Sequence, residues 1–524
     1  MYTIFLSFSL ISLYFFQGYE SACGPPPHYE MKYAVRDESY PVDKRSNSAA
    51  LKITVIYTKN FEQLKNSSAI KTKIVQRAIN FWQKTLTVKN TTTGKIHFQR
   101  YCEGGRYNQL ANGTIFCWQS PCSSSEKCGG INVPSQYLSD CLKMDNRNKL
   151  TTVYQKGSGL KAEGYLLFVD SQNTGSCINP STNAYASSCQ MDPETDRPVA
   201  GFVNFCPSKT VLEYPQSRSL YDTARHEIAH ALGFARKNFA FMRAPDGSPR
   251  TQRDPLTKIP TIRDQYGVYQ PSNTTVREIT RRWVSAAGTY TKTFPALVTE
   301  TIIREAKSHF QCQSVDGVDL ENEGSSGSFG SHFEGRVYSN ELMAAASEVE
   351  AFASKLTLAF FADSGWYTVN FNLADKWNYA KGYGCGFVSS SCYKFASDKK
   401  KRGESIKPYC DKPDIVTCKD LYSYGLCDVI QFPLTLPPAD QFFGPEAGAN
   451  YARLGGNDPF KDKCPTLGFL SSLGKLNVTS YCRHAENNAK IVKEYNTFCS
   501  HLEKHFVCSI LELGNIKKDI LYGH

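Results

Sequence analysis

The distribution of apolar residues predicts an N-terminal region built from strands and helices. Residues Leu51 to Tyr57 alternate apolar and polar side chains, as a half-buried strand does. The stretch from Ile70 to Leu86 has apolar residues at helical spacing and predicts an amphipathic helix that packs on a sheet. Two apolar runs, Tyr165 to Val169 and Val199 to Phe205, predict buried strands, and another helix is expected from about Ser219. This order of elements predicts an α/β subdomain that ends shortly after the second helix.

The pattern changes in the second half of the chain. A helical stretch is expected near Pro295 to Phe310, and a long helix with one apolar face from roughly Ser347 to Asp363. From Gly382 onward the chain is dense in cysteine, which predicts a disulfide-stapled domain with few long elements. The expected fold class is therefore α+β, with a mixed sheet, a central and mostly helical subdomain, and a disulfide-rich C-terminal domain. The predicted divisions are a signal peptide over residues 1–21, a short pro-segment or leader over 22–48, an N-terminal subdomain over 49–235, a central subdomain over 236–375 and a cysteine-rich domain over 376–524.

The N-terminus carries the features of a secretory signal. The apolar run from Ile4 to Phe16 suits a signal-peptide core and is too short to span a bilayer. No later apolar run is long enough to be a transmembrane helix, and the last ten residues lack the hydrophobic tail of a lipid-anchor signal. A soluble, secreted, extracellular protein is expected. The pair Lys44 and Arg45 in the leader is either a processing site or two solvated charges.

Cysteine content and glycosylation sequons agree with this route. The chain has 19 cysteines, which implies a disulfide framework, and the odd number leaves at least one thiol without an intramolecular partner. The formal net charge of +11 is spread along the chain, so it indicates a solvated surface that could favour anionic cell-surface polymers, and no nucleic-acid partner is expected. Five Asn-x-Ser/Thr sequons are candidate glycosylation sites: Asn66, Asn90, Asn112, Asn273 and Asn477.

The chemistry of the chain centres on a short motif in the second predicted helix. His226, Glu227 and His230 form the pattern H-E-x-x-H, in which two histidines one helical turn apart bind zinc and the glutamate acts as base. Ile228, Ala229, Ala231 and Leu232 around them are apolar, and Gly233 is a natural helix stop. The alternative is a buried helix with two hydrogen-bonded histidines and no metal. A catalytic zinc site also needs a third protein ligand.

The third ligand is not in the compact position. In the pattern H-E-x-x-H-x-x-G-x-x-H the last histidine follows the glycine by three residues, but here Arg236 stands at that position. Among the other histidines, His309 has a plausible buried position beside Phe310. We favour His332, because a Gly/Ser-rich loop precedes it and lets the backbone approach a site closely. A methionine, Met343, follows eleven residues later.

These motifs together resemble the leishmanolysin (invadolysin-like) family of zinc metallopeptidases, in the metzincin clan. The matching segments are His226 to Phe234, Gly330 to Glu334, Asn340 to Ala344, Ser308 to Cys312, and Gly384 to Cys392, and the likeness extends from about Leu51 into the cysteine-rich region. The resemblance implies one zinc ion per chain, held by His226, His230 and His332, with Glu227 as catalytic base and Met343 as a Met-turn beneath the metal. It implies a secreted endopeptidase that hydrolyses proteins or peptides, with extracellular matrix or cell-surface proteins as expected partners.

The leader contains Cys23, whose removal would leave an even number of cysteines. A thiolate there could occupy the open position of the metal and keep a proenzyme silent. Family pro-segments place His-Asp soon after this cysteine, whereas here Gly24 to His28 follow, so a structural or unpaired Cys23 is the alternative.

Two other functions fit the same motifs. The chain could be a catalytically silent adhesion or matrix-binding protein on the peptidase scaffold, although such proteins usually lose the glutamate or a ligand. The third hypothesis is a zinc hydrolase that acts on small amides.

Overall fold

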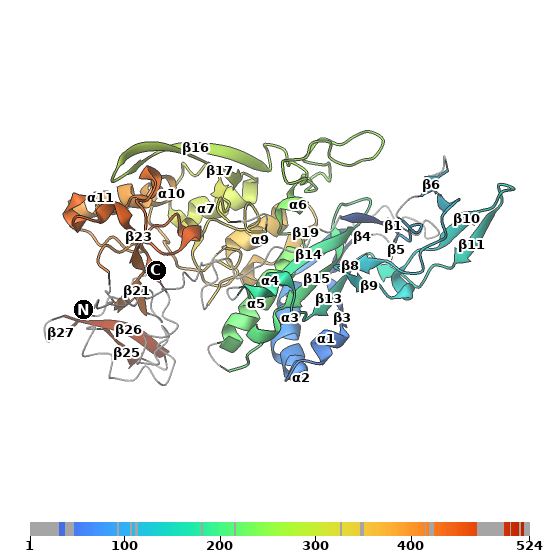
Figure 1. Ribbon diagram of the computed structural model, residues 1–524, viewed down its shortest axis with the longest axis horizontal. Coiled ribbons are helices and arrows are strands. Elements are labelled where there is room, and N and C mark those ends of the chain that lie inside the picture. Colours follow the sequence, from blue (N-terminus) through green and yellow to red (C-terminus); the bar gives the residue numbers. More distant parts are fainter. Residues whose placement is uncertain are drawn as a thin grey trace, which may run out of the picture.

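The computed structural model describes residues 31–36, 47–91, 94–104, 107–110, 114–179, 182–213, 216–324, 327–345, 350–413, 416–418, 424–468, 497–502, 505–512 and 515–517. The architecture is mixed α+β, as the sequence predicts (Figure 1). Among the described residues, no helix is both long and apolar enough to cross a membrane. Helices and a mixed sheet lie at the centre, a stapled arm extends from one end, and the cysteine-rich part lies at the other.

A seven-stranded mixed sheet forms the N-terminal part. Its strand order is β12-β5-β1-β14-β15-β13-β3, in which β3, β13 and β15 run parallel to one another and β14 runs antiparallel to β15. The strands are β1 (Lys32–Arg36), β3 (Lys52–Tyr57), β5 (Lys95–Phe98), β12 (Leu160–Lys161), β13 (Gly164–Asp170), β14 (Ala184–Met191) and β15 (Pro198–Phe205). The predicted strands at 51–57, 165–169 and 199–205 are confirmed. Strand β1 comes from the region predicted as a leader, and β14 was not predicted.

Each face of this sheet has its own core, because successive side chains of a strand point to opposite faces. Tyr165, Leu167 and Val169 of β13 belong to the main core, whereas Leu166 and Phe168 belong to a second core on the other face. The helices on the main-core side lie side by side in Figure 1. They are α1 (Lys59–Glu62), α2 (Ser67–Ile70), a π-helical turn η1 (Lys71–Val75), α3 (Gln76–Thr85) and α5 (Gln216–Ala231). The predicted amphipathic helix is therefore confirmed, as α2, η1 and α3 in series.

The five cysteines between Cys102 and Cys141 staple an arm that extends from the sheet (Figure 1). Two disulfides lie within the arm, Cys102–Cys117 and Cys122–Cys141, and a third joins Cys128 to Cys189 of β14. The arm strands are β6 (Asn108–Gln109), β7 (Ile115–Cys117), β8 (Lys127–Cys128), β9 (Ile131–Asn132), β10 (Cys141–Met144) and β11 (Leu150–Tyr154). Nearby, α4 (Gly175–Ile178) is joined to the end of β15 by Cys177–Cys206.

The prediction that the central part is mostly helical is wrong, because strands and helices share its described residues, and two predicted helices begin later than expected. A long hairpin, β16 (Val276–Ser285) and β17 (Gly288–Leu297), includes Pro295, so the helix expected from Pro295 begins only at Glu300 as α7 (Glu300–Phe310). The helix predicted from about Ser347 begins at Lys355 as α9 (Lys355–Asp363), because Ser354 caps it. The remaining elements here are α6 (Arg236–Phe239), β18 (Val318–Asp319), α8 (Gly335–Tyr338) and a small sheet of β2 (Asn47–Ala50), β4 (Leu86–Thr91) and β19 (Tyr367–Val369).

The C-terminal part contains few long elements, as predicted from its cysteines. Disulfides join Cys312 to Cys385, Cys392 to Cys464 and Cys410 to Cys427. The elements are α10 (Cys385–Ser389), α11 (Cys392–Lys401), β20 (Val416–Cys418), β21 (Tyr424–Cys427), β22 (Val429–Gln431), β23 (Leu454–Gly456), β24 (Leu467–Gly468), β25 (Thr497–Leu502), β26 (His505–Glu512) and β27 (Asn515–Lys517).

Candidate metal centre

Helix α5 places its motif deep in the main core. The indole nitrogen of Trp82 on α3 donates to the carbonyl of Arg225, 3.0 Å away, which sets α5 against its neighbour. The helix ends as predicted at Gly233, which has φ +120° and allows Phe234 N–H to bond back to the carbonyl of Ala229 at 2.9 Å. His226 and His230 consequently face the same side of a rigid, buried helix.

Three histidines meet at this site. The Nε2 atoms of His226 and His230 are 2.9 Å apart, and those of His230 and His332 are 3.0 Å apart. The third separation, between His226 and His332, is 3.2 Å. The structure thus brings together the three residues that the sequence singled out as ligands, although His332 lies more than one hundred residues along the chain.

The other ring nitrogen of each histidine faces a main-chain carbonyl. Nδ1 of His226 lies 2.5 Å from the oxygen of Leu342, and Nδ1 of His230 lies 2.5 Å from the oxygen of Phe234. Nδ1 of His332 lies 3.3 Å from the oxygen of Ser328. A carbonyl only accepts, so each Nδ1 carries the proton and each Nε2 presents a lone pair to the centre.

Burial keeps these rings neutral. It lowers the pKa of His226 to about 4 and that of His332 to about 3, and it lowers the pKa of His230 well below its ordinary value. Neutral imidazole is the form in which histidine binds a metal.

This donor set fits a zinc ion. Three lone pairs that converge at about 3 Å repel one another unless a cation lies between them. Tetrahedral zinc with bonds of about 2.0–2.1 Å requires ligand nitrogens about 3.3 Å apart, close to the separations found here. A second close group, Cys117, Cys122 and Cys141, does not compete, because all three sulfurs are in disulfides.

Main-chain hydrogen bonds hold the loop that carries His332. The N–H of Glu321 donates to the carbonyl of His332 at 2.9 Å, and the N–H of Gly330 donates to that of Glu321 at 2.8 Å. Arg236, which stands where a compact motif would have its third histidine, contacts this same loop: its N–H lies 3.4 Å from Ser331 Oγ and its guanidinium lies over the Phe329 ring. Arg236 therefore supports the loop instead of supplying a ligand.

The alternative ligand, His309, lies elsewhere. Its ring stacks on Trp377 with centroids 4.0 Å apart, and its Nε2 lies 2.9 Å from the carbonyl oxygen of Tyr379. It is a half-buried histidine stacked on Trp377 and does not join the three-histidine cluster.

Met343 lies in a buried turn that is hydrogen-bonded to His226 and to Phe333, the residue after His332. Its carbonyl accepts from the N–H of Phe333 at 2.8 Å, next to His332, and the preceding carbonyl, of Leu342, accepts from His226. The carboxylate of Glu341 shapes the turn, because it accepts from Met343 N–H at 2.6 Å and from the hydroxyl of Thr357 at 2.6 Å. Met343 itself is fully buried.

The remaining predicted site residues are distributed as follows. Glu227 is fully buried on α5, between the two histidines of the motif. The sequons at Asn66 and Asn273 are exposed, and the side chain of Asn90 in β4 is not described. Cys23, Asn112 and Asn477 lie outside the described residues.

Sequence reasoning missed the ion pairs beside the motif. Arg225, the residue before His226, is buried and forms ion pairs of 2.7 Å with Asp222 of its own helix and with Asp375. It also donates to the carbonyl of Ala351 at 2.9 Å. An arginine inside an apolar helix face is the signal that could have indicated such a partner, since buried charges need one.

Comparison with known proteins gives a consistent match. The sequence profile of the leishmanolysin peptidase family matches residues 149–501. The chain is 31% identical to a leishmanolysin-like peptidase of Drosophila pseudoobscura pseudoobscura, over 87% of this chain and 69% of that protein. It is 32% identical to a leishmanolysin-like peptidase of Caenorhabditis briggsae, over 84% and 69%. A ciliated left-right organizer metallopeptidase of Xenopus laevis is 29% identical over 49% of this chain and 33% of its own length.

Proposed function

Because this chain belongs to the leishmanolysin family and is a metalloendopeptidase, we propose that it is a secreted zinc enzyme with Glu227 as its base. In this proposal His226, His230 and His332 hold the metal. The substrates are proteins or peptides, and extracellular matrix or cell-surface proteins are the class expected outside the cell. The proposed architecture is of the metzincin type. It has an N-terminal subdomain over 49–235, a central subdomain over 236–375 and a cysteine-rich domain over 376–524.

The convergence of three Nε2 atoms within 3.2 Å of one another carries this proposal. Since every Nδ1 faces a carbonyl, the three lone pairs have no proton donor among themselves. A buried cluster of this kind is unfavourable without a cation and favourable with one.

Zinc bound by neutral imidazoles keeps its full charge, acidifies water and polarises a peptide carbonyl. The carboxylate of Glu227 then accepts the proton of the attacking water and can return it to the leaving amine. The carbonyls of Leu342 and Phe234 keep His226 and His230 in the tautomer that leaves Nε2 free. Met343 supports the site from its turn and is not a ligand.

Secretion rests on separate observations. The apolar run at the N-terminus suits a signal peptide, and the disulfides of the described part of the chain suit an oxidising compartment. Exposed sequons at Asn66 and Asn273 are the sites where glycans would be found first. Mass spectrometry of protein recovered from culture medium, before and after glycosidase treatment, tests all three points.

We also retain Cys23 as a candidate switch of the proenzyme. The test is a Cys23→Ser proprotein, which would be active before processing if the thiolate occupied the metal. A variant as latent as wild type would leave Cys23 as a structural or unpaired cysteine.

The deciding experiment compares wild type with Glu227→Ala on a library of quenched peptides, with the zinc content of each protein determined. Cleavage by wild type alone, with zinc in both, supports the proposal. Zinc in both proteins and cleavage by neither, after removal of the leader, would favour the adhesion or matrix-binding alternative. Cleavage of small amides without cleavage of peptides would favour the third hypothesis.

A further inference from the structure

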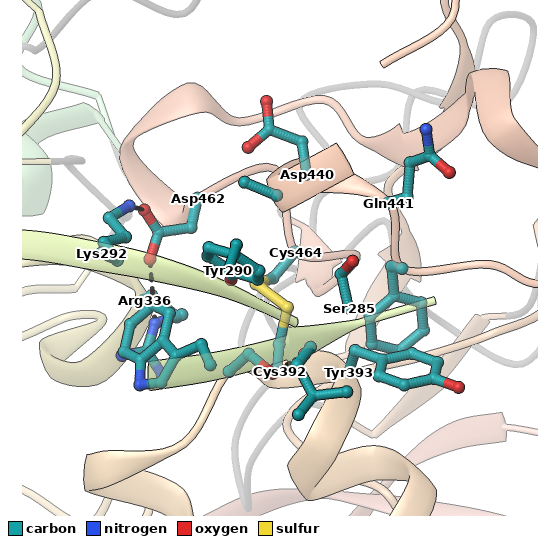
Figure 2. A pocket seen from close by; sticks show the side chains of 15 residues that line it. Ser285, Tyr290, Lys292, Arg336, Cys392, Tyr393, Asp440, Gln441, Asp462 and Cys464 are labelled. Atoms are coloured by element: carbon teal, nitrogen blue, oxygen red, sulfur yellow. Dashed lines mark hydrogen bonds and ion pairs between the residues drawn. A yellow bond between two sulfur atoms is a disulfide. The ribbon is translucent and has the colours of Figure 1, made fainter. Parts of the chain in front are cut away.

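Asp462 lies between the buried Arg336 and the partly buried Lys292, which come from distant parts of the chain. Figure 2 shows its carboxylate joined to Lys292 of β17 and to Arg336 of α8. Arg336 Nε donates to Asp462 Oδ2 at 3.0 Å, and the Arg336 side chain is only 1% exposed. Asp462 follows a 3₁₀ turn, Pro459–Lys461, in the C-terminal part. One carboxylate thus links the hairpin, the helix after His332 and the C-terminal part.

The same turn approaches the main chain next to the third histidine. A Cβ atom on Gly335 would lie only 2.4 Å from the carbonyl oxygen of Phe460, so the two backbones are in direct contact there. The turn is also fixed covalently, because Cys464 is joined to Cys392 of α11. The C-terminal part consequently contacts the main chain at Gly335, three residues after His332.

Hydrogen bonds continue from Arg336 toward His332. The N–H of Arg336 donates to Glu334 Oε1 at 3.2 Å, and the N–H of Glu334 donates to the carbonyl of Asp319 at 3.0 Å. Two residues after Asp319, the N–H of Glu321 donates to the carbonyl of His332 at 2.9 Å. The position of Arg336 is therefore tied to both ends of the loop that presents the histidine.

The cavity beside these residues does not explain the cluster as a ligand site. It has a volume of about 20 Å³ and is lined by Trp283, Tyr290 and the ion pairs of Asp462 (Figure 2). About 10–15 Å³ is the minimum for one water molecule, so the space suits a water and no organic ligand. The ion pairs of Asp462 with Lys292 and Arg336 therefore have a structural role and do not form a ligand site.

We propose that Asp462 is a positioning residue for His332, through which the C-terminal part sets the third metal ligand. The identity of the metal rests on the proposed function, but the positioning of His332 does not depend on peptide cleavage. Burial alone would raise the pKa of Asp462, but the charges of Lys292 and Arg336 outweigh burial and lower it. The carboxylate is thus ionised at neutral pH, and neutralising it removes the ion pairs that join it to the buried Arg336 and the partly buried Lys292.

The test is Asp462→Asn in the full chain, with zinc affinity measured by competition with a chelator. The expected result is roughly tenfold weaker zinc binding, the scale seen when a group that orients a metal ligand is lost. Asp440→Asn is the matched control, because Asp440 pairs with Lys463 at 2.7 Å in the same region but is partly exposed. Its zinc affinity should equal that of wild type.

Melting of the metal-free and zinc-loaded proteins separates positioning from general stability. Positioning predicts that zinc raises the melting temperature less in Asp462→Asn than in wild type. An equal rise, with unchanged zinc affinity, would overturn the proposal even if both melting temperatures fell. If Asp462→Asn does not fold, Lys292→Met keeps the bond between Asp462 and Arg336, and a loss of about threefold is expected. Unchanged affinity in that folded variant would equally refute the idea.

These outcomes are independent of peptidase activity. A protein that binds zinc tightly but cleaves nothing would contradict the proposed function and leave the role of Asp462 to be decided by its zinc affinity. If the wild type cleaves peptides and both Asp462→Asn and Lys292→Met bind zinc as tightly as wild type, the proposed function stands and the role of Asp462 is refuted.

Discussion

His226 Nδ1 lies 2.5 Å from the carbonyl oxygen of Leu342, a residue 116 positions further along the chain. This contact joins the helix of the H-E-x-x-H motif to the turn that contains Met343. It fixes both the tautomer and the direction of the imidazole ring. The central part therefore contributes one of the three converging histidines, His332, and also orients another, His226, that it does not itself carry.

Replacing Glu227 should remove catalysis and spare the metal. Glu227→Gln keeps the shape of the side chain but cannot accept the proton of water, so kcat is expected to fall by about 10²–10⁴-fold. The zinc content should stay at one ion per chain, since Glu227 is not one of the three converging groups. Peptide cleavage and metal analysis on the same preparation check both statements.

The control for this prediction is Glu300→Gln, an exposed glutamate at the first position of α7. It should leave kcat within twofold of wild type. Equal loss of activity in both variants would mean that the loss is not specific to Glu227 and would contradict its role as the base.

Replacing His332 should release the metal. His332→Asn removes one of three converging Nε2 atoms, and zinc affinity is expected to fall by more than about 100-fold. His309→Gln is the comparison, because His309 is packed against Trp377 and takes no part in the cluster. It should keep zinc even if it lowers the melting temperature. Stoichiometric zinc in His332→Asn at micromolar chelator would contradict the assignment of the third ligand.

Local patterns predicted the motif helix from its H-E-x-x-H spacing, one strand from its alternation and two strands from short apolar runs, all of which can be seen among neighbours in sequence. The strand Ala184–Met191 escaped prediction because its buried residues include Ser187, Ser188 and Gln190, so it shows neither an apolar run nor an alternation of apolar and polar residues. The choice of His332 depended on a flexible loop and a following methionine. The proximity of that histidine to the motif helix depends on the tertiary fold, so no local sequence pattern can predict it.

The two helix errors have tertiary causes as well. The apolar pattern that begins near Ser347 does not continue a helix through Phe352, because Phe352 N–H donates to the carbonyl of Asn340 and Ser354 bonds to Glu341. These contacts bind the segment to the Met343 turn, so α9 begins only after Ser354. Likewise, Pro295 lies at the end of β17, where pairing with β16 outweighs local helix propensity.

Acidification should destabilise the fold through His309. Burial lowers the pKa of His309 in the folded protein to about 4, whereas the unfolded chain titrates near 6.5. Between these values the unfolded state binds more protons, so the free energy of unfolding is full above pH 6.5 and falls as the pH is lowered toward 4. One proton corresponds to at most about 1.4 kcal/mol per pH unit.

Denaturant unfolding of wild type and His309→Gln between pH 7.5 and 4.5 measures this effect. Both proteins keep the three-histidine site, so release of zinc contributes equally to both curves. Wild type should lose stability more steeply than His309→Gln between pH 6.5 and 4.5. Parallel curves would show that His309 does not titrate differently in the two states.

Gly233→Ala should disturb both the fold and the site. Gly233 has φ +120°, which strains any residue with a Cβ, and an added Cβ would lie 2.6 Å from Cζ3 of Trp366, a side chain only 1% exposed. Strain of about 1–3 kcal/mol and overpacking of about 1–3 kcal/mol together predict a loss of about 2–6 kcal/mol. Because the carbonyl of the next residue, Phe234, binds His230, zinc affinity should fall as well.

Gly247→Ala is the matched control, with φ +86° but nothing within 4 Å of the added Cβ, so it carries the strain without the clash. Thermal unfolding and chelator competition of the two variants separate these terms: the melting temperature should fall more in Gly233→Ala, and only that variant should bind zinc more weakly. Equal melting temperatures would show that Trp366 moves aside, and unchanged zinc binding would show that Phe234 does not orient His230.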